Sequence, residues 1–201
     1  DYTAAISAFN NITSRSLVAN FGDNFSYAAE NNSESLFEWQ AGLQEGFENI
    51  WLNNDFGQNM SMHSYWGFFN CEWSFWAGTP FIPTQKIINA FEPGDPRIAE
   101  CIDSTTDQRF NGTMWTKYNK NIGTQGMTAS LNNPRILRYA DVLLLRAEAV
   151  LQSGGDNAEA IELINQVRAR ARGTGSLIPA DRPITEANSD VIMQWIMDER
   201  F

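Results

Sequence analysis

The side chains best suited to covalent chemistry are few and scattered along this sequence. His63 is the single histidine, and Cys71 and Cys101 are the two cysteines. A Ser-His-Asp arrangement through His63 stays open, but no Gly-x-Ser-x-Gly motif is present to hold the nucleophile. A structural zinc site needs a cluster of ligands at short spacings, which these residues lack. We therefore predict a packing or loop histidine, no metal and no cofactor, while the cysteines form either one disulfide or two buried thiols.

Carboxylate pairs are the second kind of residue with catalytic potential. Glu45 and Glu48 have the residue types of a glycosidase acid and base. That chemistry requires a defined separation across a cleft, which sequence spacing does not supply. Charged residues on a solvated surface are the better explanation of such pairs. Sequence spacing alone therefore assigns no catalytic pair.

A stretch rich in aromatic and amide residues is the better candidate for chemistry, in this case binding. Residues 41–82 contain four of the seven tryptophans and follow neither a helical nor a strand period. Long irregular stretches in compact domains are usually packed or functional. An indole ring can stack on a sugar ring, and side-chain amides bond to neutral sugar hydroxyls; core packing is the open alternative for each ring. The predicted ligand-binding residues are Tyr65, Trp66, Asn70, Trp73 and Trp76, with Gln58 and Asn59 as further amide partners.

Composition narrows the classes of partner. The chain has 201 residues, 43% of them apolar, and a formal net charge of −10. An acidic protein is poorly suited to nucleic acid or anionic membranes, because both are bound by neutralising phosphate with Lys and Arg. No apolar run is long enough to span a bilayer. The chain begins at Asp1 without a signal peptide, and we expect a processed protein or a portion of a larger one.

The elements that must position these residues are mainly helical, and residues 134–172 give the clearest pattern. Apolar residues recur every three or four positions from Ile136 to Leu151, which predicts a helix buried over much of its circumference. We expect Gly154 and Gly155 to end this helix with positive φ angles, and Asp156 to cap a second helix. The basic end of that second helix is predicted to be solvated: Arg168, Arg170 and Arg172.

Shorter patterns cover much of the remaining chain. Helices are predicted over 2–13, 83–91 and 189–201, and short strands or extended segments over 30–40 and 98–104. The first of these helices weakly repeats the second helix of the hairpin, as in tetratricopeptide arrays. The predicted fold class is mainly α, with stacked tetratricopeptide-like helical hairpins, long irregular loops and little β structure.

Four segments carry motifs in a recognisable order. They are ENNSESLFEWQ at 30–40, PTQKIINAFEPGDPR at 83–97, RYADVLLLRAEAVLQSGGDNAEAIELINQVRARA at 138–171, and IMDERF at 196–201. Together they resemble the SusD/RagB family of outer-membrane nutrient-binding lipoproteins. That family is about twice this long or more, so the chain resembles its middle to C-terminal portion. We expect residues 1–201 to form one SusD-like region, with a helical hairpin at 134–172 and an aromatic-rich irregular insertion at 41–82.

The resemblance implies carbohydrate binding without catalysis. Members of the family are lipid-anchored on the extracellular face of the outer membrane of Bacteroidetes. They bind glycans or other nutrients and deliver them to a SusC-like TonB-dependent transporter, which places them in polysaccharide utilization and nutrient uptake. We expect the lipid anchor to belong to the full-length protein and to lie outside this portion. Ligand residues vary among members, so the resemblance assigns none here.

Two other functions stay open at this stage. A helical-repeat scaffold could bind protein only, namely the transporter, and would bury its tryptophans behind a flat apolar face. A glycoside hydrolase would place two carboxyl groups across a deep cleft. Exposed tryptophan in the 51–76 region would instead favour glycan binding.

Overall fold

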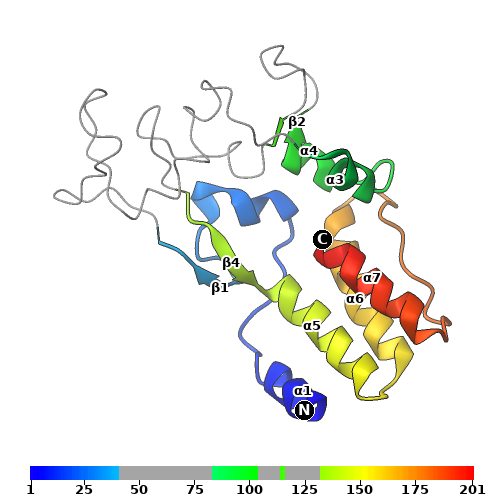
Figure 1. Ribbon diagram of the computed structural model, residues 1–201. Coiled ribbons are helices and arrows are strands. Elements are labelled where there is room, and N and C mark those ends of the chain that lie inside the picture. The colour runs from blue at the N-terminus through cyan, green and yellow to red at the C-terminus, as the bar shows by residue number, and fades with distance from the viewer. Residues whose placement is uncertain (41–82, 104–113, 116–131) are drawn as a thin grey trace, which may run out of the picture.

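The computed structural model describes residues 1–40, 83–103, 114–115 and 132–201. Within these ranges the protein consists of helices with two small antiparallel strand pairs (Figure 1). The prediction of a mainly α fold with helical hairpins and little β is confirmed. The insertion predicted at 41–82 lies outside the described residues.

A three-helix unit contains the main apolar core. Helices α5 (Tyr139–Gln152) and α6 (Asn157–Arg172) form the predicted hairpin, and α7 (Ser189–Arg200) packs against both (Figure 1). Each helix turns one apolar stripe inward, as its sequence period requires. The side chains at the centre of this core, all fully buried, are Ala147, Ala160, Ile161, Ile164, Ile192 and Ile196.

The turn between α5 and α6 uses its two glycines differently. Gly154 has a φ of 74°, the left-handed conformation that glycine adopts without a steric cost. Gly155 does not have a positive φ; its backbone N–H bonds to the Val150 carbonyl at 2.9 Å, and a Cβ here would lie 3.0 Å from that oxygen. The prediction was therefore right for Gly154 and wrong for Gly155. The Asp156 side chain accepts a hydrogen bond from the Ala158 N–H at 2.9 Å, as predicted for a cap.

The first helix of the hairpin begins later than predicted. Residues Arg135–Arg138 form strand β4, which pairs antiparallel with β1 (Ser35–Glu38), and α5 starts only at Tyr139. Two adjacent apolar residues in β4 fit a helical stripe, but pairing with β1 supplies backbone hydrogen bonds to both strands. The strand predicted within 30–40 is confirmed by β1.

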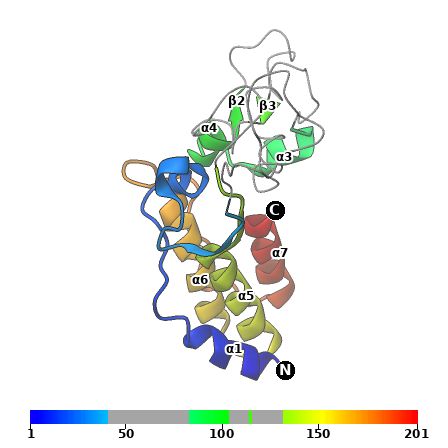
Figure 2. The ribbon, with the colours of Figure 1, turned by 90° about the vertical axis from the view of Figure 1, so that its left-hand side faces the viewer.

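The other elements surround this frame. Helix α1 (Tyr2–Asn10) packs on α5 at the end far from the β1–β4 pair (Figure 2). Residues 98–104 were predicted as a strand, but helix α4 occupies Arg97–Cys101 and only the next two residues form a strand, β2. The Asp95 carboxylate accepts a hydrogen bond from the Arg97 N–H, which favours the start of a helix at this point. The remaining elements are η1 (Phe21–Phe25), η2 (Tyr27–Ala29), α3 (Gln85–Ala90), β2 (Ile102–Asp103) and β3 (Met114–Trp115).

Candidate functional site

The predicted ligand-binding residues cannot be placed in this structure. Tyr65, Trp66, Asn70, Trp73 and Trp76 all lie outside the described residues. They stay predictions, as do the roles considered for His63, Cys71, Glu45 and Glu48, which also lie there. Cys101 is described, and it is buried at the end of α4. The side chains that the structure does bring together are the charged residues of the four motifs.

Glu34 is the first residue at which side chains from several of these motifs contact one another. Its side chain is fully buried, and its carboxylate accepts hydrogen bonds from the Val18 N–H at 3.0 Å and the Asn24 side-chain amide at 3.1 Å. The Arg138 guanidinium donates to it at 3.2 Å, and Arg170 forms a second ion pair with the same carboxylate. Residues from β1, the start of α5 and the end of α6 are thereby joined through one acid.

Glu38, also fully buried, forms a second meeting point beside the first. Its carboxylate pairs with the Arg135 guanidinium at 3.2 Å and accepts hydrogen bonds from the Asn133 side-chain amide at 2.9 Å and the Asn31 N–H at 3.0 Å. Arg135 also donates to the Ser26 carbonyl at 2.7 Å. Glu34 directly precedes β1 and Glu38 ends it, so the two buried glutamates of the Glu-Ser-hydrophobic-Phe-Glu motif lie at opposite ends of this strand.

A third group of charges joins α6, α7 and the turn before α4. Arg97 forms a two-pronged pair with Asp95, the closest N–O distance being 2.6 Å, and donates to Glu199 at 3.0 Å. Arg168 pairs with the other oxygen of Glu199 and with Glu92. Burial alone lowers the pKa of Arg97, but the hydrogen bonds that Arg97 donates to Asp95 and the negative charge of Glu199 outweigh this effect and raise the pKa. Arg97 therefore stays charged.

The predicted solvation of the α6 end is wrong. Arg168 is only 2% exposed and the Arg170 side chain only 5%. The sequence shows a basic helix end, but acids from distant segments, together with the loop carbonyl of Ala180 at 2.6 Å from Arg168, cover it. Arg172, which pairs with Asp181 at 2.6 Å near the surface, comes closest to the prediction.

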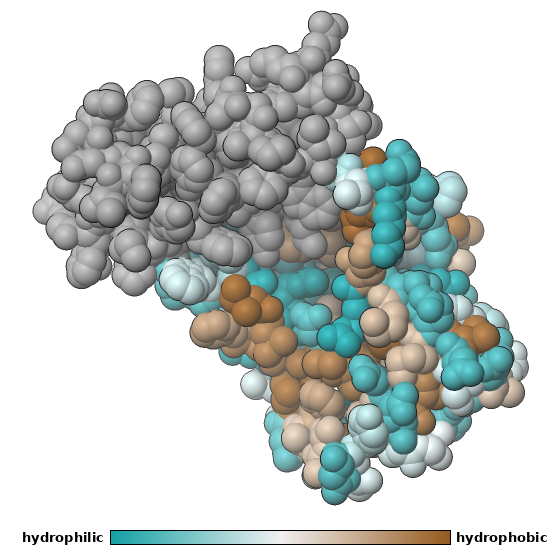
Figure 3. Space-filling view, in the orientation of Figure 1, coloured by the Kyte–Doolittle hydropathy of each residue, from teal (hydrophilic) through white to brown (hydrophobic). Residues whose placement is uncertain are grey.

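The β1–β4 pair and the residue after β1 carry apolar side chains that are open to solvent. Phe37 and Trp39 flank the buried Glu38 and are 58% and 51% exposed, and Ile136 and Leu137 are exposed on the neighbouring strand. Figure 3 shows this apolar surface over β1 and β4. Beside it, the exposed side-chain amides of Asn31 and Gln40 hydrogen-bond to each other at 2.9 and 3.1 Å. This face offers rings and neutral amides on a rigid support.

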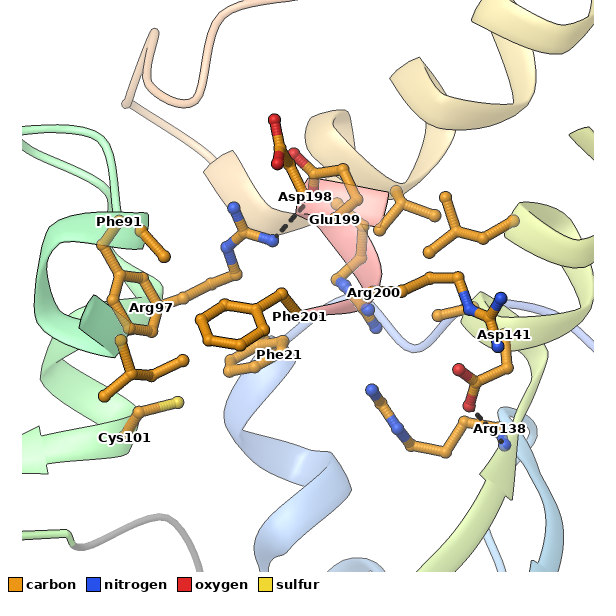
Figure 4. Close-up of a pocket in the computed structure, with 16 residues that line it drawn as sticks. Phe21, Phe91, Arg97, Cys101, Arg138, Asp141, Asp198, Glu199, Arg200 and Phe201 are labelled. Atoms are coloured by element: carbon orange, nitrogen blue, oxygen red, sulfur yellow. Dashed lines mark hydrogen bonds and ion pairs between the residues drawn. The ribbon is translucent and has the colours of Figure 1, made fainter. Parts of the chain in front are cut away.

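A cavity of about 130 Å³ lies where α3, α4, α5, α6 and α7 meet η1. Figure 4 shows the Phe21 and Phe201 rings on one side and the Arg138 and Arg200 side chains beside them. The cavity is thus part apolar and part basic. No group of His, Cys, Asp and Glu in the described ranges could hold a metal ion, and no helix there is long and apolar enough to cross a membrane.

Comparison with known proteins decides the family. The model of the SusD family matches residues 99–201. The chain belongs to the SusD family. The SusD-like protein P2 of Formosa agariphila is 29% identical over 140 residues, which is 59% of this chain and 27% of that protein.

Solved structures share the fold over almost the whole chain. A SusD superfamily protein from Bacteroides vulgatus superposes with a TM-score of 0.66 at 23% identity, covering 99% of this chain and 44% of that one. The surface glycan-binding protein A of Bacteroides thetaiotaomicron, in complex with laminarihexaose, gives a TM-score of 0.65 at 18% identity, covering 98% and 48%. The chain thus spans about a quarter of the curated SusD-like relative and under half of these structures.

Proposed function

We propose that this SusD-family chain is part of a cell-surface protein that binds glycan without catalysing a reaction. The observation that carries the proposal is the family membership, together with a fold shared with a surface glycan-binding protein crystallised with laminarihexaose. The charge network supports it physically, because arginine–carboxylate pairs hold a rigid frame, and rigid frames suit binding sites on the segments between them.

The described carboxylates support binding over hydrolysis. The pKa of Glu30 is raised by burial, partly offset by a hydrogen bond from the Asn133 N–H and by the charge of Arg135, and raised further by Glu38. A raised pKa beside a second acid is the pattern of a glycosidase pair. Glu38, however, is fully buried and paired with Arg135, so no sugar can reach it. This pair serves the frame, and a hydrolase function gains no support from it.

The same proposal includes the partner and the place of action. The bound glycan would be handed to a SusC-like TonB-dependent transporter, with the protein lipid-anchored on the outer face of the outer membrane. The ligand would stack on the aromatic residues of the 41–82 insertion, for which Trp66, Trp73, Trp76, Tyr65 and Asn70 stay our proposed contacts. A neutral glycan suits a protein with a net charge of −10, since stacking and amide hydrogen bonds need no charge.

Binding to a panel of neutral oligosaccharides tests this function. Affinity electrophoresis and titration calorimetry on the full-length protein should identify at least one ligand. Trp73→Ala and Trp76→Ala should each weaken binding about tenfold, the loss expected for one stacked ring. Tyr2→Ala, which removes a 48%-exposed ring on α1, is the matched control and should leave affinity unchanged. Unchanged affinity in both tryptophan variants would exclude the proposed aromatic platform.

A second candidate function, protein binding alone, has one observation in its favour. The exposed face of Phe37, Trp39, Ile136 and Leu137 joins aliphatic to aromatic side chains, a composition common at protein contacts. Its occupant would be the transporter. Leu137→Ser and Ile136→Thr should then reduce co-purification of full-length protein with its transporter without changing glycan affinity. Loss of glycan affinity instead would assign this face to the ligand.

A further inference from the structure

The part-apolar, part-basic cavity has two arginines at one end that depend on the same carboxylate. Arg138 and Arg170 both line it, and both pair with the single carboxylate of Glu34. Two guanidinium groups therefore share one negative charge. The buried Nε of Arg170 has no hydrogen-bond partner among the described residues. A 5%-exposed guanidinium with an unused donor beside a cavity is a costly arrangement unless something else supplies an acceptor.

The pKa of Arg170 agrees with this geometry. Burial lowers the pKa, Glu34 raises it, and the positive charges of Arg138 and Arg97 lower it again, so that the pKa falls below the ordinary arginine value. Burial is thus the main reason that the pKa of Arg170 is lowered, and Glu34 offsets only part of that effect. Negative charge brought to this end of the cavity would be stabilised there.

The acidic residues that line the cavity are already engaged elsewhere. Both oxygens of Glu199 are taken by Arg97 and Arg168. The Asp141 carboxylate faces the backbone N–H of Arg138 at 3.4 Å (Figure 4), and Asp198 is exposed at the rim, where Gln194 donates to it at 2.7 Å. Among these three acids, no ion pair joins Glu199 or Asp198 to Arg138 or Arg170 in the described residues, and Asp141 bonds to the backbone N–H of Arg138.

We propose that this cavity binds a small organic carboxylate, with the carboxylate at the Arg138 and Arg170 guanidinium groups and an apolar body against Phe21 and Phe201. Guanidinium groups match a carboxylate through paired N–H donors. A carboxylate would supply the acceptor that the buried Nε of Arg170 lacks among the described residues. The apolar side selects a ligand with a hydrocarbon body over a bare inorganic anion.

The size of the cavity limits the ligand. Its volume of about 130 Å³ is close to the roughly 150 Å³ of an engineered protein cavity that admits benzene. One ring or a short aliphatic chain fits, and a whole oligosaccharide does not. Arg200 lies at the cavity and is exposed, so it can contact a ligand without being part of the buried frame.

Titration calorimetry with sodium benzoate and with benzamide tests the proposal on the chain as it stands. The two probes have nearly the same shape and differ in charge. Benzoate should bind about tenfold more tightly than benzamide, because only the anion satisfies the guanidinium donors. Arg170→Gln should abolish this preference, and Arg200→Gln should reduce benzoate affinity several-fold. Arg146→Gln, which alters a surface arginine paired with Glu159, is the matched control and should behave as wild type.

Four results would overturn the proposal. Equal affinity for benzoate and benzamide would show that the cavity takes apolar molecules without regard to charge. Tighter binding of inorganic phosphate than of benzoate would assign a dianion instead. The absence of a heat of binding with both benzoate and benzamide would show that the cavity is not a binding site for such ligands. Arg170→Gln could disturb the frame, so its folding is checked by circular dichroism and Arg200→Gln is measured as a second variant. Unchanged benzoate affinity in a folded Arg200→Gln variant would contradict the position proposed for the ligand in this cavity. Failure of this site leaves the glycan titration unaffected.

Discussion

At the scale of single residues, buried arginine side chains hold distant segments of this molecule together. Arg168 is held by two carboxylates and a carbonyl, and Glu199 serves both Arg168 and Arg97. Removing one partner of a buried pair leaves the other charge unsatisfied, which costs much more than losing a surface pair. Glu199→Gln should therefore lower the free energy of unfolding by about 3 kcal/mol. Urea denaturation measures it.

The matched control for that measurement is a surface glutamate on α5. Glu148 contacts Arg200 at 3.4 Å, and both side chains are about one-third exposed. Glu148→Gln should change the free energy of unfolding by less than about 0.5 kcal/mol. Equal losses in the two variants would mean that the buried network adds no more stability than a surface pair.

Glu30 gives stability a pH dependence at the residue scale. Its pKa in the folded protein is raised from 4.5, with burial as the largest cause. For a carboxyl with a raised folded-state pKa, the stabilising contribution is present below 4.5 and is lost as the pH rises through the folded-state pKa. Glu30→Gln keeps an acceptor for the Asn133 N–H without the charge. Its stability relative to wild type should therefore be greater at about pH 7 than at about pH 4. Denaturation curves at both pH values check this, and the reverse order would contradict it.

Sequence patterns gave the charged motifs but not their environment. The order of Glu34, Arg97, Arg168 and Glu199 is visible in the sequence, yet their partners lie up to 136 positions apart, as Glu34 and Arg170 do. Helical period and dipole arguments treat one element at a time, so they placed the basic end of α6 in solvent. The C-terminal end of α6 carries several arginines, and three separate motifs contain acids that pair with arginines. This combination was the signal in the sequence that a buried network exists.

At the scale of elements, the α5–α6 turn is sensitive to single substitutions at its two glycines. Gly154 has a φ of 74°, so Gly154→Ala should destabilise the protein by about 1 kcal/mol through backbone strain. Gly155→Ala should also destabilise it, because the new Cβ would lie 3.0 Å from the Val150 carbonyl oxygen, which is backbone and cannot rotate away. Thermal unfolding of both variants measures the effects. A wild-type melting temperature for Gly154→Ala would contradict the conformation assigned to this turn.

Element types were easier to predict than element boundaries. The hairpin helices and α7 follow their sequence periods because each buries an apolar stripe, and the predicted α1, α3 and β1 are also present. β4 was missed because Arg135–Arg138 continues the apolar period of α5, and only its partner β1, nearly a hundred residues earlier, distinguishes strand from helix. The binding residues predicted in 41–82 have no period at all, so residue type alone selected them.

At the scale of the whole molecule, the apolar core and the charge network stabilise different regions. The core lies almost entirely in α5, α6 and α7, whereas the segment around β1 buries few large apolar side chains. Glu34 connects the two regions through Val18 and Asn24 on one side and Arg138 and Arg170 on the other. The attachment of residues 16–38 to the helices therefore depends mainly on polar contacts.

This division predicts a selective effect of Glu34→Gln. The amide cannot neutralise two guanidinium groups, so residues 16–38 should open from the helical unit while the apolar core stays intact. Backbone amides in that segment should exchange with solvent roughly tenfold to a hundredfold faster, with α5 and α6 changing much less. Hydrogen exchange read by mass spectrometry resolves the two regions. Glu159→Gln, which loses a partly exposed pair with Arg146, is the control and should leave both exchange rates unchanged. A uniform acceleration over the whole chain would show one cooperative unit instead, because opening near β1 would then require unfolding of the core.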